Sequence, residues 1–323
     1  MRAQSEVRHG LSMLLVDVDT AIETDWHGYE GHEDLVRVED PPVEAWEALA
    51  GAGLLPKPEW LTWVADCQSS EDEFLGRMPR KERQSIAAAR RRAAADGVRL
   101  RLGDLDSTYL DAFLPLYEAR TAEKRHGWSV VSDIRGDLLA DAADYFVVSA
   151  WRGDEFVGGC INLAPSEGAM RIRFSAVDQS GRYASLARAL YLEAIREARV
   201  RGYRSVSLGT DPNLYGHVVE PGLLRFKSRL GFEPKPSHQV TGKPASDCAD
   251  LVLGFAALMD PTIMFSYRTN AVSSTASELQ AEIYSYSADV AVDQHTAALS
   301  FPVRRHVVDR RPTACATGNT APR

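Results

Sequence analysis

The chain has 323 residues, 45% of them hydrophobic and 25% charged, and its formal net charge is −8. This composition is typical of a soluble globular protein with one large domain or two small ones, and no apolar run is long enough for a membrane span. The first residues lack the apolar core of a signal peptide, and the four cysteines lie far apart without a CxxC pair. We therefore expect a cytoplasmic protein with reduced thiols, no membrane partner, and neither a disulfide framework nor a zinc site.

Charge is distributed unevenly along the chain. Residues 1–75 hold seventeen acidic residues against four basic ones, whereas residues 77–101 hold nine basic residues against two acidic ones. An acidic chain with one concentrated basic segment does not resemble a general nucleic-acid binder. The basic segment could hold a phosphate-rich ligand, or it could be a solvated helix face that balances the acidic N-terminus.

The sequence of residues 1–98 predicts three elements. An apolar run at 11–18 is typical of a strand, and a short helix is expected at 43–50 after two prolines. Residues 60–97 are expected to be helical and to end at Gly97. The basic segment therefore lies largely on the last of these helices.

Residues 99–240 carry the clearest pattern. A strand at 99–102 is followed by a helix that Asp106 or Ser107 caps and that runs to about His126. Turns separate three further apolar runs that are typical of strands, at 145–151, 157–163 and 170–177. The succession of strands and helices indicates an α/β fold.

A long helix follows, with apolar side chains at i+4 spacing. Two rows of such residues make one broad buried face: Leu186, Leu190, Ala194 and Ala198 in one row, and Tyr183, Ala187, Tyr191 and Ile195 in the other. Gly202 ends this helix, and the strand at 205–208 that comes next breaks at Gly209. A buried strand whose end opens on a glycine is a common way to build a ligand crevice.

Three segments carry a resemblance to a known family: the helix end RGY at 201–203, the strand SVSLG at 205–209 and RFKSRLGF at 225–232. They resemble the second half of a GNAT-superfamily acyltransferase domain, and more narrowly the Fem-type (FemABX-like) branch, whose members move an acyl or aminoacyl group onto an amine. The resemblance implies a mixed, mostly antiparallel sheet flanked by helices, and it allows a degenerate tandem of two GNAT-like halves. A generic α/β unit is the alternative, since helix, glycine and strand follow one another in many folds.

The same resemblance divides the chain into parts. Residues 1–98 would be an acidic, shortened N-terminal GNAT-like half that ends in the basic helix, and residues 99–240 would be the main acyltransferase domain. Residues 241–303 would form a C-terminal extension.

The C-terminal part offers weaker patterns. Residues 251–259 could be a last core strand or helix, and residues 278–292 have some helical period. The tail at 304–323 is basic, rich in Pro and Thr and poor in apolar residues, so we expect it to be disordered.

Acetyl-CoA-binding GNAT domains place a short glycine-containing loop at the start of the long helix, where backbone N–H groups and the helix dipole hold the pyrophosphate. In the aligned stretch, Arg182 fits this pattern, but Ser185 replaces the first glycine and could be a simple N-cap. The departure leaves the donor open between an acyl-CoA and an aminoacyl-tRNA, each as a co-substrate with no tightly bound cofactor. The candidate donor-binding residues are Arg182, Ser185, Gly209, and Arg90 and Arg91 on the basic helix.

Lys227 lies within the RFKSRLGF segment. In Fem-type enzymes a lysine in a matching motif is implicated in stabilising charge as the acyl group moves, and a fixed ammonium can do this for a developing oxyanion. An exposed helix lysine is the alternative. Amine acylation also needs a base for the ammonium proton and an acid for the leaving group. The loop after Gly209 offers Asp211, Tyr215 and His217 for these roles, although Asp211 also begins an ordinary turn.

The sequence therefore predicts an N-acyltransferase that moves an acyl or aminoacyl group to an amine of a small-molecule or peptide acceptor by direct attack. tRNA is a partner if the donor is an aminoacyl-tRNA. No metal is expected, because the spacing of Asp25, His27, His32 and Asp34 fits no compact metal motif. The alternative is a GNAT-fold accessory protein that binds a ligand or RNA without catalysis.

Overall fold

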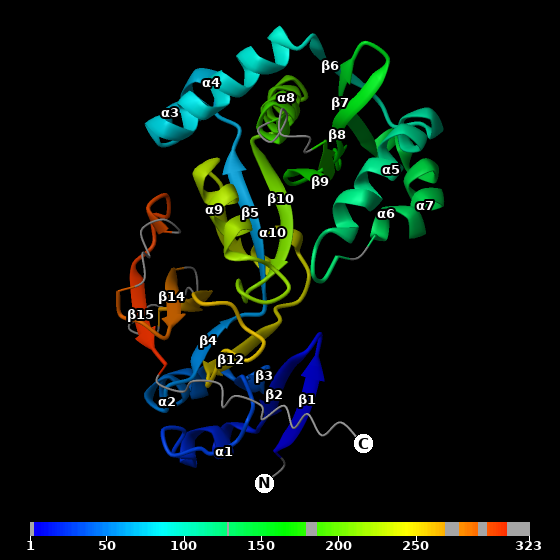
Figure 1. Cartoon of the computed structure of the whole chain (residues 1–323). Coiled ribbons are helices and arrows are strands. Elements are labelled where there is room, and N and C mark those ends of the chain that lie inside the picture. Colours follow the sequence, from blue (N-terminus) through cyan, green and yellow to red (C-terminus); the bar gives the residue numbers. More distant parts are fainter. Residues whose placement is uncertain (1–2, 128, 179–185, 269–277, 290–295, 309–323) are drawn as a thin grey trace, which may run out of the picture.

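The computed structural model describes residues 3–127, 129–178, 186–268, 278–289 and 296–308, and the strands in these residues form three sheets (Figure 1). The central sheet has seven strands, in the order β11 (Glu233–Pro236), β5 (Trp60–Asp66), β10 (Ser205–Pro212), β9 (Met170–Val177), β8 (Glu155–Leu163), β7 (Tyr145–Arg152) and β6 (Val98–Asp104). Its neighbouring strands are antiparallel except β9 and β10, which are parallel. The predicted mixed, mostly antiparallel sheet is thus confirmed.

Helices cover both faces of the central sheet. Helix α8 (Leu186–Val200) packs on one face, with α4 (Arg80–Ala95) against it, and α5 (Ser107–Ala122) packs on the other (Figure 1). Successive residues of β7 show the two faces, since Val148 lies in the core under α8 and Val147 in the core under α5. The order of strands and helices predicted for residues 99–240 is therefore confirmed.

The remaining described helices are short. They are α1 (Val18–Glu23), η1 (Val43–Ala45), α2 (Trp46–Gly51), α3 (Glu71–Gly76), α6 (Val130–Asp133), α7 (Arg135–Ala140), η2 (Ala142–Asp144), α9 (Pro221–Arg229) and α10 (His238–Thr241). Of these, α9 has a clear start, because Pro221 occupies its first turn, where a missing N–H costs nothing.

The parallel strands β9 and β10 diverge. They pair only at Met170 with Val206 and at Arg171 with Ser207. Just beyond this point each strand carries a bulge: Arg173 has no partner on β8, and Leu208 and Gly209 together face one residue of β5. Gly209 adopts a positive φ of 76°, which explains why glycine ends the regular part of the strand.

Two smaller sheets complete the described fold. The N-terminal sheet has the order β1 (Gln4–Arg8), β2 (Leu11–Leu15), β3 (Leu35–Glu39), β12 (Asp247–Val252) and β4 (Leu55–Pro58), and the third sheet has the order β13 (Thr262–Tyr267), β14 (Leu279–Ser285) and β15 (Val303–Val307). The N-terminal sheet thus takes a strand from beyond residue 240, and the central sheet takes β5 from before residue 98. The predicted domain boundaries remain predictions, and the hydrogen bonds of both sheets cross them.

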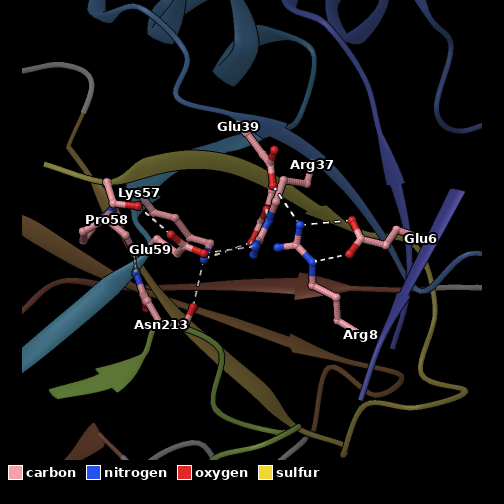
Figure 2. A network of polar contacts seen from close by, with 10 residues as sticks. Glu6, Arg8, Arg37, Glu39, Lys57, Pro58, Glu59 and Asn213 are labelled. Atoms are coloured by element: carbon pink, nitrogen blue, oxygen red, sulfur yellow. Dashed lines mark hydrogen bonds and ion pairs between the residues drawn. The ribbon is translucent and has the colours of Figure 1, made fainter. Parts of the chain in front are cut away.

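A buried network of charges joins three strands of the N-terminal sheet (Figure 2). Arg37 donates two hydrogen bonds of 2.8 Å to the Asp250 carboxylate, and the Lys57 ammonium lies 2.9 Å from it. Burial alone would raise the pKa of Asp250, but these two cations lower it to about 2. Lys57 also donates to the carbonyl oxygen of Asn213, just beyond β10, so the network connects the N-terminal sheet to the end of β10.

Three predicted elements are wrong. Residues 60–66 form strand β5 and not the start of a helix, because Leu61, Trp63 and Ala65 are buried between β10 and β11. The helix predicted at 278–292 is strand β14 at its start, where it lies between two other strands, and residues 290–292 lie outside the described residues. The predicted disordered tail begins inside β15, and residues 309–323 lie outside the described residues.

Candidate active site

A cleft of about 990 Å³ opens where β9 and β10 diverge. Two parallel strands that share only two residue pairs cannot fill the space between their later parts, so side chains from both strands line it. Helices α5, α8 and α9 and the segment from α10 onward supply the other walls. The crevice predicted beside Gly209 is therefore present, and Gly209 lines it.

Lys227 reaches this cleft from α9. Leu224, Lys227 and Ser228 share the buried face of that helix, so the lysine stands where an apolar residue would be expected. Its ammonium donates to both Asp211 carboxylate oxygens, at 2.8 and 2.7 Å, and to the Leu208 carbonyl oxygen at 3.0 Å. Burial lowers the pKa of Lys227, and the neighbouring Asp211 carboxylate opposes this shift.

Asp211 is held by a second donor. The Tyr215 hydroxyl donates to Asp211 Oδ2 at 3.1 Å and accepts from the indole N–H of Trp63 at 2.7 Å. Burial and the Asp211 charge raise the pKa of Tyr215 well above its ordinary value, so this hydroxyl keeps its proton. Trp63, Tyr215, Asp211 and Lys227 therefore form one buried chain of hydrogen bonds, which we call the lysine array.

Trp63 was not a predicted site residue. The sequence predicts a helix at Trp63, whereas the residue lies on β5 next to β10. The alternation of Leu61, Trp63 and Ala65 was the available signal for a strand.

The other predicted residues lie elsewhere. The His217 ring donates from Nε2 to the His9 carbonyl oxygen at 3.1 Å, and it lies 5.0 Å from the ring of His126, outside the lysine array. Arg90 forms an ion pair with Glu71 on the preceding helix, and Arg91 is exposed on α4. Neither arginine lines the cleft between β9 and β10. Arg182 and Ser185 lie outside the described residues.

Two other kinds of feature are absent from the described residues. These residues contain no group of three or more His, Cys, Asp or Glu side chains that could hold a metal ion. In the same residues, no helix is both long and apolar enough to cross a membrane.

Residues 80–227 match the family model described as the acetyltransferase (GNAT) domain. No curated protein matches the chain. Among solved structures, FemX is 14% identical with a TM-score of 0.45, over 75% of this chain and 81% of that one. The C-terminal domain (DUF2156) of a putative lysylphosphatidylglycerol synthetase from Agrobacterium fabrum is 13% identical with a TM-score of 0.39, over 77% and 80% of the two chains.

Because these identities and TM-scores are low, the family assignment rests on the match to residues 80–227. That range contains both diverging strands, the cleft residues that lie on them, and Asp211, Tyr215 and Lys227 of the lysine array. The sequence resemblance is thereby confirmed at the level of the superfamily for residues 80–227, which match the acetyltransferase (GNAT) domain.

Proposed function

We propose that the protein is an N-acyltransferase of the Fem type, which moves an acyl or aminoacyl group from an activated donor to an amine of a small-molecule or peptide acceptor. The observation that carries this proposal is the buried ion pair of Lys227 and Asp211 in the cleft between β9 and β10. A cation fixed in a buried site beside a cleft is suited to stabilise negative charge that develops on a carbonyl oxygen.

The reaction is a direct acyl transfer. The lone pair of the acceptor amine attacks the carbonyl carbon of a thioester or an ester, so that a C–N bond forms and the C–S or C–O bond breaks. The amine nitrogen loses one proton, and the leaving thiolate or ribose oxyanion gains one. Negative charge collects on the carbonyl oxygen before the leaving group departs.

In this reaction Lys227 supplies positive charge and Asp211 keeps it in place. The carboxylate holds the ammonium in its charged form although burial disfavours that form. Tyr215 and Trp63 in turn orient the carboxylate through two consecutive hydrogen bonds. We propose that Asp211, Tyr215 and Trp63 are positioning residues and that Lys227 is the catalytic residue.

Replacing Lys227 tests this role. We expect Lys227→Met to lower kcat by about 10²- to 10³-fold, as for the loss of one oxyanion donor, with a smaller change in KM. Since this variant leaves a buried carboxylate without its cation, the double variant with Asp211→Asn is measured beside it. Lys235→Met, at an exposed position on β11, is the matched control. Full activity in a folded double variant would contradict the proposal.

The donor is tested by thermal stabilisation. Acetyl-CoA, longer acyl-CoAs and a mixture of charged tRNAs are compared in low salt, because a ligand that binds only the folded state raises Tm. A shift with a CoA thioester assigns an acyl-CoA donor. A shift with charged tRNA alone that is lost in high salt assigns an aminoacyl-tRNA donor. No shift with any of them favours a GNAT-fold accessory protein without catalysis.

A further inference from the structure

The cleft between β9 and β10 is lined by an excess of basic side chains. Lys124, Arg171, Arg173, His238 and Lys243 line it together with Lys227. Asp211 is the one acidic residue among the described residues of this lining, and its carboxylate is already bound by Lys227. The cleft therefore presents positive charge that the protein itself does not neutralise there.

Arg171 is the cleft cation whose surroundings point most directly to a bound anion. It is only partly exposed, and no ion pair or hydrogen bond joins its side chain to another described residue. Burial lowers the pKa of Arg171, and the like charge of Arg173 lowers it further. A guanidinium in such a place is unfavourable for the protein alone, because a partly buried charge needs a partner of opposite sign.

Arg173 differs from Arg171 because aromatic groups hold it. Its guanidinium donates to the Tyr145 hydroxyl and lies 5.0 Å from the centre of the Phe174 ring. These contacts place a second cation beside Arg171 but supply no negative charge. The two arginines can therefore approach one anionic group together, and a guanidinium matches the planar oxygens of phosphate or carboxylate.

The position of Arg171 indicates whether an anion bound there belongs to the acyl donor or to the amine acceptor. Arg171 stands at the point where β9 and β10 separate, in their last shared residue pair. Beyond Arg171, β9 continues for six residues, about 20 Å of strand, before the chain reaches the segment that holds the donor-loop candidates Arg182 and Ser185. Lys124 lies on the Lys227 side, since its charge contributes to lowering the pKa of Lys227. An anion at Arg171 therefore lies in the same cleft as Lys227, near the start of β9, whereas the donor-loop candidates come after the last residue of β9 in the chain.

We propose that Arg171, with Arg173 and Lys124, forms an anion subsite that binds a phosphate or carboxylate group of the amine acceptor. This inference rests on the proposed function only in assigning the anion to the acceptor. The binding of an anion by Arg171 is independent of any catalytic activity.

The test is a calorimetric titration of the full chain and of Arg171→Met with inorganic phosphate and, separately, with succinate in low salt. Binding of either anion to the wild type, weakened about tenfold or more in Arg171→Met, supports the subsite, since hydrogen bonds to charged groups have this magnitude. The anion that binds identifies the acceptor group as phosphate or carboxylate. Arg99→Met, an exposed arginine on the edge strand β6, is expected to bind like the wild type.

Three results would overturn the proposal. These are a wild type that binds neither anion, equal binding by the wild type and Arg171→Met, and a donor affinity that falls with the anion affinity in Arg171→Met. The ligand-free Tm is a second readout, because a variant that removes repulsion from Arg173 should melt no lower than the wild type. If the protein binds the anion through Arg171 but transfers no acyl group, the proposed function is contradicted and the anion subsite is still supported.

Discussion

Lys227 lies on the face of α9 that is buried against the core. Its three hydrogens all have acceptors, two on Asp211 and one on Leu208. A buried charge is tolerated only when it is paired and hydrogen-bonded in this way. The same arrangement fixes the ammonium in one orientation, and donation to a substrate oxygen requires that one of these three hydrogens exchange its acceptor.

His217 makes the protein sensitive to acid. Burial lowers the pKa of His217, and the nearby charges of His126, Arg125 and His9 contribute. Because the folded pKa lies below the ordinary value of about 6.5, the unfolded chain binds a proton first as the pH falls. The stability that the neutral ring contributes is complete above about pH 6.5 and is lost as the pH falls through the folded pKa.

We therefore expect the free energy of unfolding to decrease below pH 6.5, by at most about 1.4 kcal/mol per pH unit from this one residue. In His217→Gln this part of the slope should disappear, and in His27→Gln, which changes an exposed histidine, it should remain. Denaturant unfolding at pH 7, 6 and 5 measures the slopes. An unchanged slope in His217→Gln would exclude this explanation.

At the scale of elements, β4 and β10 are connected through Lys57 and Asn213. Lys57 bonds the Asn213 carbonyl oxygen, and the Asn213 amide donates to the carbonyl oxygens of Pro58 and Phe265. Asn213 also accepts from the backbone N–H of Phe265, so its side chain joins β4, β10 and β13. Asp211 of the lysine array lies two residues before Asn213, so this junction helps to fix the position of Asp211.

Removing the lysine of this junction should destabilise the protein strongly. Lys57→Met leaves Asp250 with Arg37 alone and the Asn213 carbonyl oxygen without this donor, and breaking a buried ion pair costs about 3–5 kcal/mol. Urea unfolding measures the change, with Lys81→Met at an exposed position of α4 as the control. A loss equal to that of the control would show that the network contributes little.

At the scale of the whole molecule, the predicted acyltransferase domain at 99–240 lacks one strand of its own sheet. In the full chain β5 lies between β10 and β11, and its Leu61 and Trp63 are fully buried. We expect a fragment of residues 99–240 to unfold without a cooperative thermal transition. A fragment of residues 60–240, which restores β5, should show a sharper one. Cooperative unfolding of the shorter fragment with native circular dichroism would confirm the predicted boundary instead.

The sequence predicted what local periodicity determines. The strands β6 to β9 and helix α8 follow from apolar spacing, and the glycine that opens the cleft follows from the break after the strand at 205–208. The pairing of β5 and β12 with distant strands could not be read in this way, because partner choice depends on contacts between residues far apart in the chain. For the same reason His217, although close to Tyr215 in sequence, faces His9, and Arg171 was not singled out among the side chains of β9.

The place of β12 also sets the order in which the protein can fold. β12 lies between β3 and β4, and the ion pair that joins Arg37 to Asp250 spans 213 residues of sequence. Closing so long a loop is slow compared with local pairing. During synthesis, the sheet of β1 to β4 therefore lacks its strand between β3 and β4 until β12, which ends at residue 252, has left the ribosome. By then every residue that matches the GNAT domain has already emerged.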